Sequence, residues 1–279
     1  MEKRGLVDFA REQFGASTRL ACKVLQISRT TYQYKPDTKR DDPVIDALQQ
    51  LAEKYPRYGF GKMFPILRRQ GHPWNHKRVH RIYCELKLNM RRKGKRRLPT
   101  RNPAPLSVPA SINQCWSIDF MSDALWSGRK FRTFNMVDDY NREALAIEVD
   151  LSLPAERMIR VLDRVSEWRG YPEKLRMDNG PELTSVKLAD WSEEHGVQLE
   201  FIEPGKPTQN SFVERFNRTY REEVLNMYVF NSLDEVRELT KTWLKEYNEE
   251  RPHESLGNLT PVEYLGINLK LENSNNARH

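Results

Sequence analysis

The stretch QCWSIDFM, residues 114–121, has the alternating pattern of a β-strand with two different faces. Successive side chains of a strand point to opposite sides of the sheet. Asp119 is therefore a carboxylate within an otherwise apolar strand, where its burial costs free energy unless hydrogen bonds or a cation compensate the charge. For Asp119 alone, both explanations stay open. The two faces hold alternate residues, with Trp116, Ile118 and Phe120 on one and Cys115, Ser117 and Asp119 on the other.

Around this strand the sequence predicts a sheet flanked by helices, because apolar residues alternate in some segments and recur every three to four positions in others. The order strand, strand, strand, helix, strand, helix, strand, helix resembles a ribonuclease-H-like fold of the α/β class. Ser232 and Glu235 form a capping box that predicts one more helix, over 232–248. The predicted strands are 114–121, 129–139, 144–149, 173–177 and 197–202, and the predicted helices are 154–169, 184–195 and 208–227.

A basic, proline-rich segment precedes this region. RRKGKRR, residues 91–97, has six basic residues out of seven, and residues 98–112 contain prolines that exclude regular helix and strand. We interpret 98–112 as an extended linker and the basic run as an arm that lies on DNA phosphates. A solvated spacer is the alternative. The candidate DNA contacts in the run are Arg91, Arg92, Lys93, Lys95, Arg96 and Arg97.

The N-terminal part of the chain is predicted to be helical. Residues 1–36 indicate a helix-turn-helix, because two short amphipathic helices, over 6–13 and 17–26, precede a third helix that Ser28 can cap. Arg29 would then face a DNA groove; otherwise it is an ordinary surface residue. Residues 37–97 predict a second helical DNA-binding unit, which carries the candidate DNA contacts Lys77 and Arg78. Its expected helices are 43–54, 61–70 and 75–86.

The same unit has His76, His80 and Cys84 at the spacing of one helix face. Zinc sites of this kind need a fourth ligand, and no Cys-x-x-Cys follows. We therefore expect these side chains to belong to the core or flank of the helix and not to a metal site.

Formal charge divides the chain into a basic front and an acidic back. Residues 1–100 hold 24 Lys and Arg against 9 Asp and Glu, a net charge of +15, whereas residues 101–279 hold 22 against 30, a net charge of −8. Such a basic half favours a nucleic-acid partner, with a solvated basic surface as the alternative.

The composition also indicates an intracellular protein. The three cysteines, Cys22, Cys84 and Cys115, are scattered and odd in number, which does not suggest a disulfide framework. No apolar run approaches the roughly 20 residues of a membrane-spanning helix, and residues 1–14 lack the apolar centre of a signal peptide. We expect a cytoplasmic location and no membrane partner.

Two more carboxylates complete a possible site with Asp119. Asp178 directly follows the strand 173–177, and Glu214 lies on the helix 208–227 beside Asn210, Arg218 and Arg221. Taken singly, Asp178 reads as a turn residue and Glu214 as a salt-bridged surface residue. Taken together, two strands and one helix can converge three oxygen donors, which can hold two Mg²⁺ or Mn²⁺ ions for phosphoryl transfer. Arg221 would then contact a DNA phosphate.

Four motifs in order carry a resemblance that covers nearly the whole chain. Asp178 and Glu214 are separated by 35 residues, and Arg221 follows seven positions after Glu214. The chain resembles the DDE transposases of bacterial insertion sequences, of the retroviral-integrase-like type whose catalytic frame is often called OrfB. The N-terminal YPRYGFGKM and NHKRVHRI are similar to the helical pre-domain of that family. The motifs are NQCWSIDF (113–120), MDNGPEL (177–183), PTQNSFVERFNRTYREEVL (207–225) and YNEERPHESLGNLTPVEYL (247–265).

The resemblance implies a catalytic integrase core over 113–227, which a C-terminal helix and tail, 228–279, complete. It implies Mg²⁺-dependent cleavage at element ends and transfer of the 3′-hydroxyl to target DNA, by a homo-multimer assembled on DNA that brings terminal inverted repeats and target together. Asp119, Asp178 and Glu214 would be the metal ligands. Asn210, Arg218 and Arg221 would contact DNA, and Asn179, Gly180 and His253 would support the site.

One departure from the family pattern concerns its upstream frame. Family members commonly add a helix-turn-helix and a leucine zipper by frameshifting, whereas this chain starts without a heptad run. A partner protein or fusion from that frame is therefore an open possibility for recognition of element ends. Two other functions remain as alternatives: a DNA-binding regulator, which has no need of the three carboxylates, and a nuclease of the same fold without strand transfer.

Overall fold

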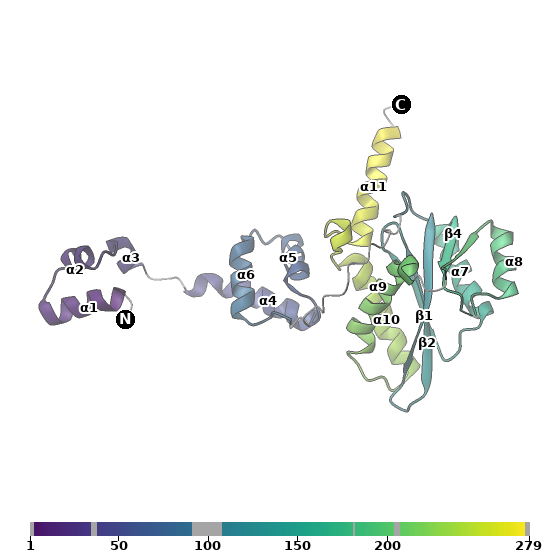
Figure 1. Ribbon diagram of the computed structural model, residues 1–279, viewed down its shortest axis with the longest axis horizontal. Helices are drawn as coiled ribbons and strands as arrows, with labels where there is room; N and C mark the ends of the chain where they lie inside the picture. The colour runs from purple at the N-terminus through teal and green to yellow at the C-terminus, as the bar shows by residue number, and fades with distance from the viewer. Residues whose placement is uncertain (1–2, 35–37, 91–107, 181, 204–206, 277–279) are drawn as a thin grey trace. The chain divides into compact units, whose positions relative to one another are not determined.

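A computed structural model describes residues 3–34, 38–90, 108–180, 182–203 and 207–276, with the side chains of 38, 207–208 and 269–276 excepted (Figure 1). The chain divides into two compact units, Met1–Gln50 and Leu51–His279. The basic run 91–97, with its six candidate DNA contacts, lies outside the described residues, as does most of the linker 98–112. Within the described residues, no helix has both the length and the apolar character that crossing a membrane requires.

The first unit contains the three helices that the sequence predicts. They are α1 (Lys3–Phe14), α2 (Thr18–Val24) and α3 (Arg29–Gln33), followed by the single turn η1 (Thr38–Asp41). Ser28 caps α3 as expected, because its hydroxyl accepts a hydrogen bond from the Thr31 N–H across 2.9 Å. A small core of Val7, Ala21 and Cys22 joins the helices.

The helical segment that follows begins with α4 (Asp42–Lys54), which crosses the boundary between the units, and continues with α5 (Phe60–Arg69) and α6 (His76–Glu85). Asn75 caps α6 by accepting a hydrogen bond from the Lys77 N–H across 2.8 Å. The rings of His76 and His80 pack edge-on against Phe60, with centroids 5.0 and 4.7 Å away. These contacts give both histidines a packing role in the segment.

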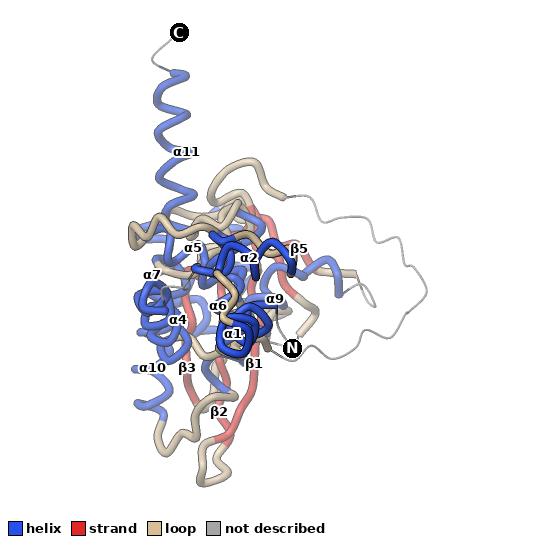
Figure 2. Tube along the Cα trace, turned by 90° about the vertical axis from the view of Figure 1, so that its left-hand side faces the viewer, coloured by secondary structure: helices blue, strands red, loops and turns tan. Residues whose placement is uncertain are grey.

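The second unit is built on a five-stranded sheet in the order β3–β2–β1–β4–β5 (Figure 2). The first three strands are antiparallel neighbours, and β4 and β5 continue the sheet parallel to β1. This is the strand arrangement of the ribonuclease-H-like fold that the sequence predicts. The strands are β1 (Cys115–Ala124), β2 (Lys130–Asp138), β3 (Ala144–Asp150), β4 (Lys174–Met177) and β5 (Gln198–Phe201).

Helices cover both faces of the sheet (Figure 1). Trp116 and Ile118 of β1 belong to the core beneath α7 (Ala155–Arg169) and α8 (Val186–His195). Met121, on the other face of β1, packs with residues of α9 (Ser211–Tyr220) and α10 (Leu233–Glu249). The alternation of β1 therefore confirms its predicted faces and directs Asp119 toward the α9 side.

The predicted helix 208–227 is three pieces in the structure. A 3₁₀ turn, η2 (Pro207–Asn210), leads into α9, and a π-helical turn, η3 (Arg221–Leu225), follows it. Apolar periodicity does not distinguish these hydrogen-bond patterns, so the sequence predicts one continuous helix. Near the C-terminus, a turn η4 (Glu254–Leu256) and a helix α11 (Pro261–Asn276) follow α10; α11 was not predicted.

Candidate active site

The first two carboxylates lie on neighbouring parallel strands. The register of β1 with β4 pairs Ser117 with Arg176, so Asp119 and Asp178, each two residues further on, come to the same level of the sheet. Both side chains are partly exposed. The end of β4 therefore places Asp178 beside Asp119 at the edge where an open α/β sheet has its ligand sites.

The third carboxylate approaches from α9. Glu214 is exposed in the first turn of this helix, whereas Val213, Phe216 and Tyr220 are buried against the sheet. Burial of Asp119, together with the negative charges of Asp178 and Glu214, raises the pKa of Asp119 to about 6. Both neighbouring charges thus act on Asp119, and this is an unfavourable interaction that a bound cation would relieve.

Asp119 is held by two hydrogen bonds. Its Oδ1 accepts from the Phe120 N–H across 2.7 Å, and its Oδ2 accepts from the side-chain amide of Asn217 across 2.8 Å. The carbonyl oxygen of Asn217 in turn accepts from the amide of Asn135, which is opposite Asp119 on β2, across 2.6 Å. Asn217 and Asn135 are both buried. The chain Asn135–Asn217–Asp119 therefore fixes α9 and the carboxylate to each other.

The loop after β4 orients Asp178. Its Oδ1 accepts a hydrogen bond from the Gly180 N–H across 3.0 Å, which makes a tight Asx turn. A Cβ on Gly180 would lie only 3.0 Å from the same oxygen, so the turn leaves no free space for a side chain. The Asn179 amide donates to the Ile202 carbonyl across 2.9 Å and ties the loop to the segment after β5.

Family comparisons match most of the chain. The integrase core domain models cover residues 109–207 and 195–261, and an HTH-like domain model covers 39–96. A protein of insertion element IS407 from Burkholderia multivorans is 39% identical over 255 residues, which span 91% of this chain and 92% of that protein. The chain belongs to the DDE transposases of bacterial insertion sequences.

Two more relatives agree with this assignment. A protein of insertion element IS476 from Xanthomonas euvesicatoria is 35% identical over 276 residues, 99% of this chain and 80% of that protein. The putative transposase InsK of IS150 from Escherichia coli is 25% identical over 259 residues, 87% of this chain and 91% of that protein. The integrase core and the HTH-like segment make this family member a DNA-binding, nucleic-acid-processing enzyme.

The donor set of the site fits a hard divalent cation. Asp119, Asp178 and Glu214 offer only carboxylate oxygens, the ligands that Mg²⁺ and Mn²⁺ prefer. Among the described residues, no three His, Cys, Asp or Glu side chains are already grouped closely enough to hold a metal ion. The strand register places Asp119 and Asp178 at the same level of neighbouring strands, and the charge of Glu214 on α9 acts on Asp119.

The predicted DNA contacts on α9 lie in different environments. Arg218 is exposed, whereas Asn210 is buried, with its amide 3.4 Å from the Ile118 carbonyl oxygen. Arg221 is partly exposed and is held by Asp123, 3.1 Å away, and by the Ser122 carbonyl, 2.9 Å away. Of the predicted contacts in the helical segments, Arg29 and Lys77 are exposed and Arg78 is partly buried.

His253 has its contacts at the C-terminal end of the unit. Its Nε2 lies 3.4 Å from the Tyr247 carbonyl oxygen, its ring packs edge-on against Tyr247, and its backbone bridges to Leu259. Burial, followed by the charge of Arg251, lowers the pKa of His253 to about 3. The imidazole is therefore neutral at ordinary pH and braces the segment after α10.

Two further aspartates, Asp138 and Asp139, pair with basic side chains of the protein. Asp138 and Asp139 at the end of β2 are fully buried. Asp139 accepts from Ser117 across 2.6 Å and pairs with Arg176 at 2.7 Å, while Asp138 pairs with Arg169 at 3.2 Å. Their charges are compensated within the protein by these partners.

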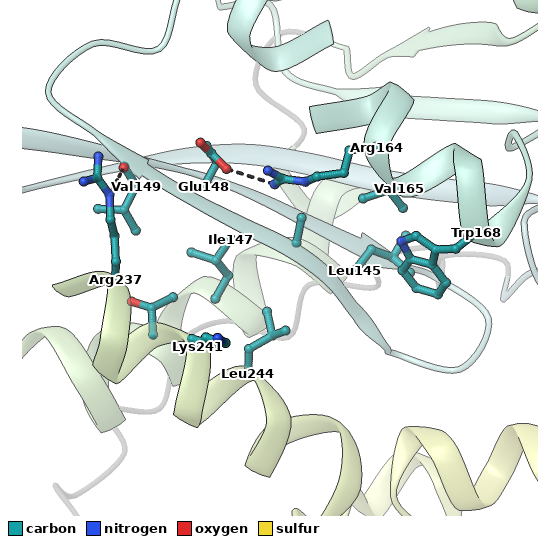
Figure 3. A pocket seen from close by; sticks show the side chains of 12 residues that line it. Leu145, Ile147, Glu148, Val149, Arg164, Val165, Trp168, Arg237, Lys241 and Leu244 are labelled. Atoms are coloured by element: carbon teal, nitrogen blue, oxygen red, sulfur yellow. Dashed lines mark hydrogen bonds and ion pairs between the residues drawn. The ribbon is translucent and has the colours of Figure 1, made fainter. Parts of the chain in front are cut away.

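A groove of about 360 Å³ lies elsewhere on the molecule, along β3 between α7 and α10 (Figure 3). Glu148 accepts from Arg164 across 2.9 Å on one side of it, and Arg237 donates to the Val149 carbonyl across 3.2 Å on the other. None of the three carboxylates lines this groove. The candidate active site therefore lies at the carboxyl end of β4, beside β1, and is separate from this groove.

Proposed function

We propose that this chain is the catalytic transposase of an insertion sequence, which cleaves DNA at the 3′ ends of the element and transfers those ends to target DNA. The observation that carries the proposal is the β1–β4 register, which puts Asp119 beside Asp178. Glu214 adds a third negative charge that acts on Asp119. Family membership supports DNA as the substrate, and the three carboxylates support metal-dependent phosphoryl transfer as the reaction.

Asp119, Asp178 and Glu214 would hold Mg²⁺ or Mn²⁺, two ions per site by analogy with two-metal phosphoryl transfer. Bound metal would activate water or a 3′-hydroxyl and stabilise the leaving 3′-oxygen. The protein's own contribution is orientation. Asn217 holds one oxygen of Asp119, and the Gly180 N–H holds one oxygen of Asp178, so these hydrogen bonds restrict the rotation of both carboxylates.

DNA would be bound by the basic half of the chain and by the exposed face of α9. The proposed contacts are Arg218 and Arg221 near the site, Lys77 and Arg78 on α6, Arg29 on α3, and the basic run 91–97. In this arrangement residues 1–36 and 37–97 are DNA-binding units, and 113–227 with 228–279 form the catalytic unit. The protein would act in the cytoplasm as a multimer on DNA, alone or with an upstream-frame partner.

The test uses purified protein, supercoiled plasmid and short duplexes that carry the element ends, with Mg²⁺ or Mn²⁺. Joining of a labelled 3′ end to plasmid is expected for the wild type. Asp178→Asn removes one ligand charge with little change of shape and should abolish joining. Asp190→Asn, an exposed aspartate on α8, is the matched control and should join normally.

Each of the other two functions predicts a different result. Metal-dependent nicking without joining would point to a nuclease or to a catalytic frame that lacks its recognition partner. DNA binding by both proteins with no DNA chemistry in either would contradict the transposase reaction and favour a regulator.

A further inference from the structure

The π-helical turn η3, which continues the helix that carries Glu214, contains the acidic residue Glu223 on a different side of the helix axis. Glu223 lies nine residues after Glu214, which places it roughly half a turn round the helix axis. Glu214 is exposed, whereas the side chain of Glu223 is only 10% exposed. Glu223 belongs to the π-helical turn η3, and such turns occur frequently at functional sites.

Glu223 is the centre of a buried polar cluster. Its carboxylate pairs with Arg251, and its Oε2 accepts a hydrogen bond from the Trp243 indole N–H across 3.0 Å. The Arg251 side chain is 8% exposed, and its guanidinium stacks near the ring of Tyr247, 5.7 Å from the centroid. The cluster thus joins η3, α10 and the segment that follows α10.

The cluster also reaches residues that precede α5. The Tyr58 hydroxyl lies 3.4 Å from Arg251 Nη1, and the Tyr58 ring lies 5.2 Å from the guanidinium carbon. Lys62 of α5 lies 3.8 Å from Glu223, and burial lowers the pKa of this lysine to about 8. One buried carboxylate on the catalytic helix therefore contacts the helical segment that the HTH-like family model covers.

A second group of contacts fastens the same two parts. Arg69, at the end of α5, donates to the Glu250 carbonyl across 2.9 Å and to the Asn258 carbonyl across 2.6 Å, and pairs with Glu263 at 3.1 Å. Lys54 pairs with Glu250 at 2.8 Å. Residues 51–69 are thus held on the C-terminal segment 246–263 through directional charged contacts.

A buried ion pair is a poor means of gaining stability, because desolvation offsets much of the attraction and apolar replacements are often neutral or stabilising. Its geometric requirement is strict, however, because both charges need their partners in one arrangement. Such a pair therefore specifies orientation more than it adds stability.

We propose that the Glu223–Arg251 pair is a positioning device for DNA: it sets the orientation of α5 and α6 relative to Asp119, Asp178 and Glu214, so that DNA bound by these helices reaches the carboxylates in register. The proposal rests on the proposed function for its DNA substrate. Glu223 and Arg251 act through the helices that they hold and are positioning residues, not catalytic ones.

The test variant is the double substitution Glu223→Gln with Arg251→Met in the full chain. It removes both charges of the buried pair and keeps an acceptor for the Trp243 N–H, while Lys62, whose side chain is 32% exposed, loses its ionic contact with Glu223. The matched control is Lys245→Met with Glu249→Gln, an exposed pair within α10. The spectroscopic readout is the spin–spin distance between a label on Cys84, the exposed cysteine of α6, and a second label on Glu193→Cys of α8.

We expect the double variant to melt within about 5 °C of the wild type, to broaden the spin–spin distance distribution about twofold, and to lose about tenfold or more in joining of element ends. Metal-dependent nicking of plasmid without element ends should stay within about twofold, because the carboxylates are intact. The control pair should change none of these quantities.

An unchanged distance distribution together with unchanged joining in the double variant would overturn the proposal. If that variant does not fold, Tyr58→Phe with Lys62→Met, which removes the contacts of the pair with α5 and with the residues before it, must broaden the distribution, and an unchanged distribution there would overturn the proposal too. The distances do not depend on catalysis. A broadened distribution in the double variant together with no DNA chemistry in the wild type would therefore support the positioning role and contradict the proposed function.

Discussion

The side-chain amide of Asn217 donates a hydrogen bond to Asp119 across 2.8 Å, from a helix to the central strand of the sheet. Asn217→Ala removes this donor, and Asp119 keeps only the hydrogen bond from the Phe120 N–H, which leaves its second oxygen unsupported. Groups that orient metal-binding carboxylates typically affect activity by about 10- to 100-fold, and we expect a loss of joining in that range. The measurement is the rate of 3′-end joining at several Mg²⁺ concentrations.

Asn226→Ala is the control for this change, because Asn226 is exposed after the π-helical turn. It should retain the wild-type rate. Equal rates for Asn217→Ala and Asn226→Ala would show that Asp119 needs no side-chain support.

Gly180→Ala tests the tight turn around Asp178. The added Cβ would lie 3.0 Å from Asp178 Oδ1, so the carboxylate must shift by a few tenths of an ångström or lose its hydrogen bond to the Gly180 N–H. We expect about a tenfold loss of joining with the free energy of unfolding changed by less than about 1 kcal/mol. Gly266→Ala, where a Cβ meets nothing within 4 Å, should leave joining unaltered. Wild-type joining by Gly180→Ala would mean that the turn adapts freely.

Arg221 offers a test of DNA contact near the site. It is held by Asp123, so binding of a phosphate requires Arg221 to exchange one anionic partner for another. Arg221→Ala should weaken DNA binding and reduce the slope of log K against log salt by about one, whereas Asp123→Asn should strengthen binding by releasing the guanidinium. Both are measured by fluorescence anisotropy without divalent metal.

Arg164→Ala is the matched control, since Arg164 pairs with Glu148 at the groove along β3 (Figure 3). Its salt slope should equal that of the wild type. A wild-type slope for Arg221→Ala would remove Arg221 from the set of phosphate contacts.

His253 predicts a specific acid sensitivity. Its folded-state pKa of about 3 lies below the ordinary value of 6.5, so between these values the unfolded chain binds a proton that the folded chain does not. Folding stability should therefore fall as pH drops from 6.5 toward 3, by about 2 kcal/mol between pH 6.5 and 5 from this residue.

The measurement is urea unfolding at several pH values. His253→Gln cannot take up the proton, so its free energy of unfolding should decline less steeply below pH 6.5 than that of the wild type. Parallel declines for the two proteins would assign the acid sensitivity to other groups.

The sequence predicts the elements well where the information is local. Alternation in 114–121 predicts both faces of β1, and Ser28 and Ser232 mark helix starts that the structure confirms. The proximity of Asp119 to Asp178 is not local, because it depends on the pairing of β1 with β4 across about 60 residues. The order of elements, through its resemblance to a known fold, supplied that pairing. The roles of the three carboxylates remain predictions.

The buried cluster around Glu223 was beyond prediction from sequence. On a regular helix Glu223 lies far round from Glu214 and looks like any solvated acid. The π-helical turn depends on tertiary packing. The same packing brings Arg251, which follows α10, into contact with Glu223 of that turn. Asn217 had a weaker sign of its role, because a polar residue on the buried side of an amphipathic helix needs a partner.

The contacts between residues 51–69 and 246–263 have a consequence for how such proteins diversify. These two segments are almost 200 residues apart in the sequence, yet their contacting side chains must remain complementary. Recombination that exchanges one segment without the other should therefore disrupt these contacts. A chimaera that takes its N-terminal helices from one relative and its sheet from another should assemble well only if the stretch after α10 comes from the same parent as the helices.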